Sequence, residues 1–144
     1  MVHELPPITV TTRDFDRLVA FGLDAHLRGD GHADFLLTEL KRATLCRPER
    51  LPAQVVSANC RVLYRLDEEM GIRAHFLVHP NDLDERDEGL SLASPLGTAL
   101  LGLRVGDRMP FRDNRLGTQH VVTVEAIGWR LSDGPLPSRL PRTA

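Results

Sequence analysis

The sequence predicts an α+β fold: an N-terminal short antiparallel helical hairpin followed by an antiparallel sheet with one short helix. Apolar residues recur with a helical period in two stretches between residues 12 and 46. From residue 53 onward they alternate with polar residues, which is typical of half-buried strands. A single short helical segment, residues 95–101, lies within this strand-rich half, and that arrangement belongs to the α+β class.

Composition and charge limit the classes of protein to which the chain can belong. Its 144 residues, 42% hydrophobic and 26% charged, are enough to bury the core of one compact domain or of a small domain with an appendage. A net charge of −2 does not indicate autonomous binding of nucleic acid. Because neither a signal peptide nor a membrane-spanning run is apparent, we expect a cytoplasmic protein without membrane contact. Cys46 and Cys60 indicate neither a disulfide framework nor a zinc site.

Capping and breaking residues predict the N-terminal elements. A proline pair precedes a short strand at residues 8–10, and Thr12 is expected to cap the first helix. The glycine-containing stretch LRGDGHAD, residues 27–34, ends that helix, and FLLTELKRATLC, residues 35–46, forms the second. Two helices with a short polar link make an antiparallel hairpin, about 20–24 Å long at a rise of ~1.5 Å per residue.

The remaining elements follow from strand patterns. Strands are predicted over residues 54–65, 72–80, 90–93, 109–111 and 119–129. Because the period changes between Cys46 and Ala53, we expect a hairpin domain over 1–50 and a sheet domain over 51–131, each with its own core. A proline-containing tail over 132–144 follows them.

The stretch SPLGTALLGLRVGD, residues 94–107, is best explained as a capped short helix and a turn. Ser94 is a suitable N-cap, and Pro95 fits the first helical position, where no N–H group is needed. Gly102 and Gly106 suit left-handed backbone at the helix end and in the turn. The glycine spacing matches neither common phosphate-binding motif, so a scaffold role is favoured over phosphate binding.

Two sequence patterns resemble known families. The 94–107 stretch, with an acidic loop before it and a V-T-V-E-A-I strand after it, is similar to the C-terminal domain of the Gre transcript-cleavage factors. The pattern L-x-R-A-x-x-C-x-P-E-x-x-P-x-x-V-V-x-x-N-x-R-V resembles the related Rnk family, the regulators of nucleoside diphosphate kinase. The residues that match it are Leu40, Arg42, Ala43, Cys46, Pro48, Glu49, Pro52, Val55, Val56, Asn59, Arg61 and Val62.

This resemblance implies an N-terminal coiled coil, an FKBP-like C-terminal domain and a role in transcription elongation. It implies docking of the C-terminal domain at the rim of the secondary channel of RNA polymerase, where an Rnk-type protein competes with Gre-like factors and has no catalysis or cofactor of its own. Contact with nucleic acid is then expected only indirectly, through the polymerase. The polymerase-docking region that it suggests consists of Ser94, Pro95, Leu96, Gly97, Leu100 and Arg104.

The hairpin tip decides between a competitor and a cleavage factor. In Gre factors, acidic tip residues in a pattern like G-D-x-x-E-N-A-E-Y help to hold magnesium in the active site of the polymerase. Here Gly29–Asp30 is followed by a shortened sequence that lacks the second acid at that spacing. The candidate tip residues are Asp24, Arg28, Asp30, His32 and Asp34. These carboxylates either supply magnesium ligands or stabilise the start of the second helix, and a hairpin of this length is expected to stop short of the active site.

Two other functions remain as alternatives, namely a short Gre-like cleavage-stimulating factor and, suggested by the FKBP-like fold, a prolyl isomerase. Prolyl isomerases line a pocket with aromatic residues, and from residue 51 onward this chain has only Tyr64, Phe76, Phe111 and Trp129. A metal site is not expected, because His75 and His79 lie about 13 Å apart if both are on one strand with ~3.3 Å per residue.

Overall fold

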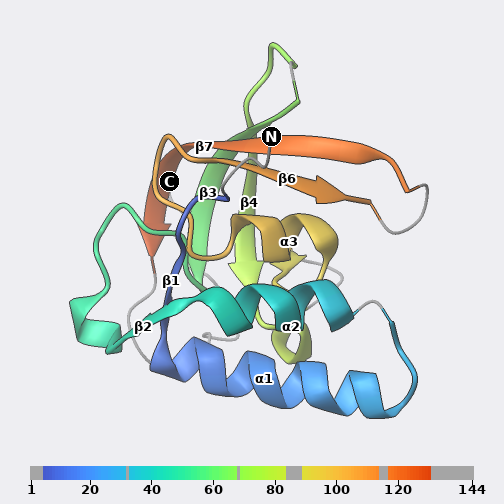
Figure 1. Cartoon of the computed structure of the whole chain (residues 1–144). Coiled ribbons are helices and arrows are strands. Elements are labelled where there is room, and N and C mark those ends of the chain that lie inside the picture. Colours follow the sequence, from blue (N-terminus) through green and yellow to red (C-terminus); the bar gives the residue numbers. More distant parts are fainter. Residues whose placement is uncertain (1–4, 32, 68, 84–88, 114–116, 131–144) are drawn as a thin grey trace.

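A computed structural model of the chain describes residues 5–31, 33–67, 69–83, 89–113 and 117–130. Two helices lie side by side along one face of a five-stranded sheet, and a third, shorter helix lies between them and the sheet (Figure 1). In chain order the helices and strands are β1 (Thr9–Thr11), α1 (Thr12–Leu27), α2 (Ala33–Arg42), β2 (Thr44–Cys46), β3 (Cys60–Leu66), β4 (Arg73–Val78), β5 (Gly89–Ser91), α3 (Pro95–Leu100), β6 (Arg108–Arg112) and β7 (Gln119–Arg130). Two 3-10 helices lie between them: η1 (Pro48–Arg50) follows β2, and η2 (Pro80–Asp82) follows β4. The predicted α+β class and the order of hairpin before sheet are confirmed.

The helical hairpin differs from the prediction at both of its ends. Thr11, rather than Thr12, caps α1, because the Thr11 hydroxyl accepts the N–H of Asp14 at 3.1 Å. The second helix ends at Arg42, and Thr44–Cys46 forms β2, which pairs in parallel with β1. The N–H of Thr44 donates to the carbonyl of Ile8 at 2.9 Å, so strand pairing replaces the last helical turn that we predicted.

The sheet has the strand order β5-β4-β3-β7-β6. Its pairs are antiparallel except for β4 and β5, which are parallel, so the expectation of a wholly antiparallel sheet is wrong and the sheet is mixed. The strand predicted over 54–65 begins only at Cys60. The residues before it run beside the segment after α3, where Val55 bridges to Arg104 and the N–H of Val56 donates to the carbonyl of Leu103 at 2.8 Å.

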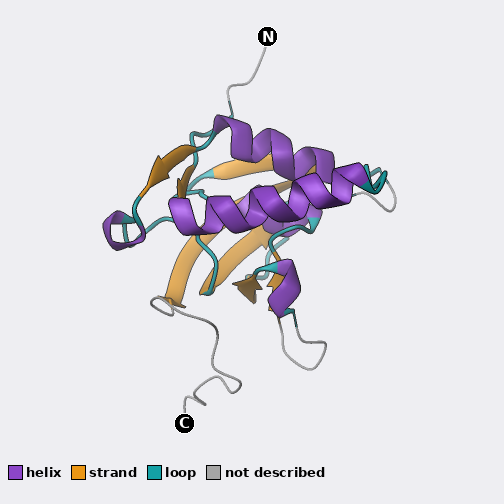
Figure 2. Ribbon diagram, turned by 90° about the horizontal axis from the view of Figure 1, so that it is seen from below, coloured by secondary structure: helices purple, strands orange, loops and turns teal. Residues whose placement is uncertain are grey.

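The expectation that the two halves have separate cores is also wrong. One buried cluster contains Leu18 of α1, Leu36 of α2, Tyr64 of β3 and Leu100 of α3. Each helix of the hairpin has a single apolar face, and the sheet also needs cover on its inner face. Burying these faces against each other removes more apolar surface from water than two small cores would. Figure 2, seen from below, shows α1 and α2 across this face.

One buried polar contact holds the hairpin on the sheet domain, and a second fixes the end of α2 to the N-terminal segment. The carboxylate of Asp14 accepts hydrogen bonds from Nε2 of His79 at 3.0 Å and from the N–H of Ala58 at 3.1 Å. Glu39, with a side chain 3% exposed, accepts two hydrogen bonds of 2.9 Å from Arg42, which also donates to the carbonyl of Pro6 at 2.7 Å. A buried carboxylate is costly without such partners, so both contacts specify where the helices sit.

Among the residues that the structure describes, no helix is both long and apolar enough to span a bilayer.

Candidate functional site

The hairpin tip is a tight turn set by glycine. At the end of α1, Gly29 has a φ of 83°, a left-handed conformation that glycine adopts without strain. The N–H of Asp30 donates to the carbonyl of Ala25 at 2.9 Å, and the N–H of Gly29 donates to that of His26 at 3.0 Å. This pair of bonds is the Schellman arrangement, which satisfies carbonyl groups that a helix end would leave unpaired. The turn brings the start of α2 back beside the end of α1 (Figure 1).

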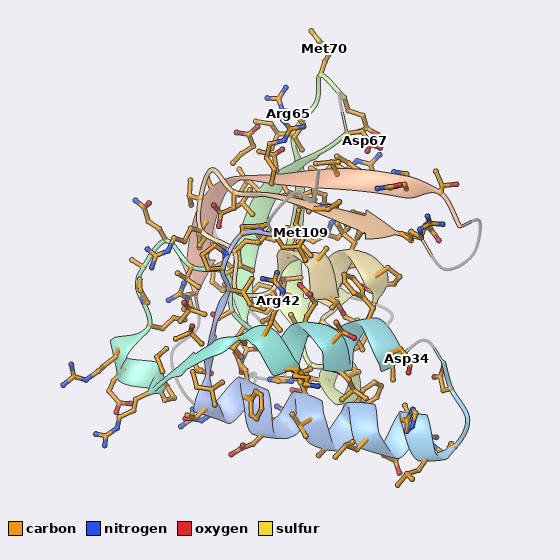
Figure 3. All side chains as sticks on the ribbon, in the orientation of Figure 1. Asp34, Arg42, Arg65, Asp67, Met70 and Met109 are labelled. Carbon is orange, nitrogen blue, oxygen red and sulfur yellow. The ribbon has the colours of Figure 1, made fainter. Side chains whose placement is uncertain are left out.

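The charged residues of the tip are paired with each other. Asp24 and Arg28, one helical turn apart, form an ion pair at 3.0 Å. Across the turn, Asp34 lies 3.6 Å from the imidazole of His26, and Figure 3 labels Asp34 at this end of α2. Of the predicted tip residues, His32 lies outside the described residues. His26 was missed, because nothing in the sequence spacing indicates which residue meets Asp34 after the chain reverses.

Two of the tip carboxylates therefore already have partners within the tip. Among the described residues, no group of three or more His, Cys, Asp or Glu side chains is arranged to hold a metal ion. A magnesium ion held by protein requires one or two carboxylates with open coordination, whereas the Asp24 and Asp34 oxygens face a guanidinium and an imidazole.

The Ser94–Asp107 stretch has the scaffold geometry that its sequence predicts. The hydroxyl of Ser94 accepts the N–H of Gly97 at 3.0 Å, which confirms Ser94 as the N-cap of α3. A Cβ on Gly97 would lie 1.9 Å from the carbonyl oxygen of Ser91, so no side chain fits there. Gly102 and Gly106 have φ values of 80° and 95°, which confirms the predicted left-handed backbone at both positions.

Burial divides the proposed polymerase-docking region into two parts. Gly97 and Leu100 are buried, and the docking role that the resemblance implies for them stays a prediction. Ser94, Pro95 and Leu96 are half-buried and Arg104 is exposed. Figure 1 gives the reason, since α3 lies between the sheet and α2 and presents only one edge to solvent. A docking role for that edge stays a prediction.

His75 and His79 have structural partners, whereas the two cysteines are not paired in a disulfide. Nδ1 of His75 lies 2.7 Å from the hydroxyl of Tyr64, while His79 contacts Asp14 instead. Cys46 and Cys60 are free thiols, and desolvation by burial raises the pKa of both above the ordinary value of 9.0. Raised pKa values keep these thiols protonated at neutral pH, where a thiol is a weak nucleophile.

A charged contact at the opposite end of the molecule was not predicted. Asp67, at the end of β3, has a φ of 54° and accepts the N–H of Val121 at 2.9 Å. Its other oxygen lies 2.7 Å from Nδ1 of His120, and this hydrogen bond lowers the pKa of Asp67 below the ordinary value of 3.8. The contact begins the β3–β4 turn, whose residue Met70 is 93% exposed and projects away from the sheet in Figure 3.

Comparison with known proteins agrees with this architecture. A family model described as "Transcription elongation factor, GreA/GreB, C-term" matches residues 51–127, and one described as "Rnk N-terminus" matches residues 6–45. The chain is 38% identical over 102 residues to the regulators of nucleoside diphosphate kinase of Escherichia coli K12 and Shigella flexneri, covering 71% of this chain and 75% of theirs. The structure of a prokaryotic transcription elongation factor GreA/GreB from Nitrosomonas europaea is similar with a TM-score of 0.65 and 30% identity, covering 85% of this chain and 99% of that one. The chain therefore belongs to the GreA/GreB family of transcription elongation factors and carries the N-terminal segment of the Rnk proteins.

Proposed function

We propose that this protein is a non-catalytic regulator of transcription elongation of the Rnk type. It docks at the secondary channel of RNA polymerase, excludes Gre-like factors from that site, and reaches nucleic acid only through the polymerase. The observation that carries the proposal is the hairpin: it is short, it is held against the sheet, and two of its tip carboxylates have partners within the tip.

The dimensions of the hairpin favour occupancy of the channel entrance over delivery of groups to a distant active site. α1 has 16 residues and α2 has 10, so their lengths are about 24 Å and 15 Å at a rise of ~1.5 Å per residue. Much of this length covers the sheet (Figure 2), and Nη2 of Arg42, at the end of α2, lies 3.9 Å from the sulfur of Met109 in β6. The part that projects is therefore shorter than the helices themselves.

The chemistry of the tip points in the same direction. A factor that delivers magnesium ligands needs carboxylates that are free to coordinate the ion. Asp24 instead forms an ion pair with Arg28, and Asp34 lies 3.6 Å from the imidazole of His26. Breaking these pairs costs only about 0.2–1 kcal/mol each at an exposed site, so it is the spacing of the carboxylates, more than the strength of the pairs, that opposes metal delivery.

A transcript-cleavage assay on backtracked elongation complexes tests the proposal. The protein alone is expected to leave the transcript intact, and an excess is expected to inhibit cleavage stimulated by a Gre factor. Asp30→Ala serves as the matched variant, and as a competitor it should inhibit as well as the wild type. Cleavage by the wild type that disappears in Asp30→Ala would instead identify a short cleavage factor.

Prolyl isomerase activity has weaker support. Tyr64 is fully buried and Phe76 and Phe111 are each 8% exposed, so these rings belong to the packing of the sheet. Trp129 packs against Phe76 with ring centroids 5.1 Å apart and the ring planes tilted by 35°. A peptide isomerisation assay is expected to give the uncatalysed rate, and an accelerated rate would overturn the non-catalytic part of the proposal.

A further inference from the structure

The five-stranded sheet has one face covered by the helices and one face open (Figures 1 and 2). Along β3, Val62 and Tyr64 are fully buried beneath the sheet, so the residues that alternate with them point to the open face. The same alternation on β6 buries Met109 and Phe111. The open face thus receives four arginines from these two strands: Arg61, Arg65, Arg108 and Arg112. Figure 3 labels Arg65, whose side chain points away from the helices.

Strand register arranges these arginines as a diagonal stripe. Arg65 pairs with Thr123 of β7, which pairs in turn with Arg108, so Arg65 and Arg108 lie in one row about 10 Å apart, two strand spacings of ~4.8 Å. Arg61 and Arg112 lie four residues further along their strands in opposite directions, each about 13 Å away at ~3.3 Å per residue. We call these four residues the arginine stripe.

Most of the charge on the stripe is uncompensated. Arg65 forms an ion pair of 2.9 Å with Glu125 of β7. For Arg61, Arg108 and Arg112, no hydrogen bond or ion pair to another residue of the described ranges is present, and all three are exposed. Like charges about 10–13 Å apart repel only weakly in water, so the stripe persists without a partner but attracts acidic surfaces.

Apolar side chains lie within the same face. Leu63 of β3 lies two residues from both Arg61 and Arg65, so it shares their face of the strand. On the same face, Pro110 of β6 pairs with Val121 of β7. These three apolar residues are half-buried, and in Figure 1 the described helices lie on the other side of the sheet. An apolar centre bordered by charge is typical of protein–protein interfaces, whereas a sugar–phosphate backbone would leave these side chains without a complementary surface.

The Ser94–Leu96 edge of α3 is too small to hold a large partner by itself. A stable interface buries about 800 Å² on each partner, contributed by roughly 20 residues. Two of the six residues suggested for docking are buried, so a further contact surface is required if the protein binds a polymerase. No helix among the described residues covers the open sheet face, and this face lies on the side opposite the hairpin, where binding leaves α1 and α2 accessible (Figure 1).

We propose that the open sheet face, through the arginine stripe and the apolar residues Leu63, Pro110 and Val121, docks an acidic surface of RNA polymerase. This inference rests on the proposed function and adds to it the surface and the charge of the contact. The complementary surface carries carboxylates at spacings of about 10–13 Å around a small apolar area, matching the stripe.

Surface plasmon resonance with immobilised core RNA polymerase tests this inference. Arg108→Glu/Arg112→Glu is expected to weaken binding at least about tenfold, because each reversal removes an attraction and adds a repulsion. The matched control is Arg47→Glu/Arg50→Glu, which also changes the net charge by −4. Its two exposed arginines are the N-cap and the last residue of η1. The control should bind within about twofold of the wild type if position on the surface, rather than total charge, determines affinity.

The possible outcomes separate the two proposals. If the wild type does not bind polymerase, both the proposed function and this inference are wrong. If the wild type and Arg108→Glu/Arg112→Glu bind equally, only the docking surface is wrong. Arg61→Glu, at the other end of the stripe, is the second variant, and it should lower affinity even if the double variant folds poorly, as judged from the thermal midpoint.

A binding measurement with RNA distinguishes a protein partner from a nucleic-acid partner. Fluorescence anisotropy with a 20-nucleotide single-stranded RNA should give weak binding that the double variant and its control alter equally. Loss of RNA binding in the stripe variant alone, with polymerase binding unchanged, would overturn the choice of a protein partner.

Discussion

The hairpin tip and the open sheet face are both exposed and charged, yet their charges are arranged differently. At the tip, Asp24 and Arg28 have opposite charges and lie 3.0 Å apart, and Asp34 lies 3.6 Å from the imidazole of His26. On the open face, three of four arginines have no partner among the described residues. A helix places residues four positions apart side by side, so Asp24 meets Arg28, whereas a strand separates such residues by about 13 Å. The carboxylates Asp24 and Asp34 therefore have partners within the tip, whereas three arginines of the sheet face are open to an outside partner.

One consequence concerns how the protein engages a partner. At the tip, Asp24 and Asp34 each already have a partner side chain, so these carboxylates attract an outside group less strongly. An uncompensated arginine stripe contributes attraction over several ångströms, an effect that weakens as salt is added. The two regions therefore have separable roles, and they are held on opposite sides of one shared core.

The largest expected effect comes from releasing the hairpin from the sheet. Asp14→Ala removes the carboxylate that pairs with His79 and the N–H of Ala58, leaving two buried donors without partners. We expect a loss of about 2–4 kcal/mol in the free energy of unfolding, measured by urea denaturation. Asp16→Ala, at an exposed position of the same helix, should change it by less than ~0.5 kcal/mol. Equal effects of the two variants would show that the buried contact does not hold the regions together.

A second change perturbs the junction between the N-terminal segment and the sheet. Gly102→Ala puts a Cβ 2.7 Å from the Cβ of Ile8 in addition to imposing left-handed strain, so we expect a loss of about 2–4 kcal/mol. Gly106→Ala has the strain alone, because no atom lies within 4 Å of its added Cβ, and should lose about 1–2 kcal/mol. Thermal midpoints measure both. A larger loss for Gly106→Ala would contradict the close approach.

The β3–β4 turn, beside the open face, allows a pH test. The folded pKa of Asp67 is lowered, chiefly by its hydrogen bond with His120, so its contribution to stability is present above the unfolded pKa of about 3.9 and is lost as the pH falls through the lower folded value. Asp67→Asn keeps a residue that tolerates the left-handed backbone but removes the charge. Its thermal midpoint should be below that of the wild type at pH 7, with the difference shrinking below about pH 4. A difference that does not depend on pH would contradict this origin.

The smallest expected effects come from removing single exposed charges at the tip and on the open face. Asp24→Ala breaks the exposed pair with Arg28, and we expect a loss of about 0.2–0.5 kcal/mol that vanishes at 1 M salt. Arg108→Ala removes an unpaired charge, so its unfolding free energy should stay within ~0.5 kcal/mol of the wild type at any salt concentration. A larger, salt-dependent loss for Arg108→Ala would mean that the stripe has a partner within the chain.

The sequence alone determined the local features and the family. The capping serine of α3, the left-handed glycines at positions 102 and 106, and the order of hairpin before sheet depend on residues close together in the chain, so their signals are local. The match to the GreA/GreB family rests on the same contiguous patterns. It identifies the architecture without identifying which surface is exposed.

Tertiary structure decided what depends on residues far apart in the chain. Thr44–Cys46 has a helical pattern but pairs with β1, because a strand partner was available, and Gly97 and Leu100 are buried because α3 lies beneath the sheet. The hairpin shares one core with the sheet because neither has enough apolar surface to bury alone. The arginine stripe depends on β7 lying between β3 and β6, and this strand order sets two arginines 43 positions apart, Arg65 and Arg108, in one row.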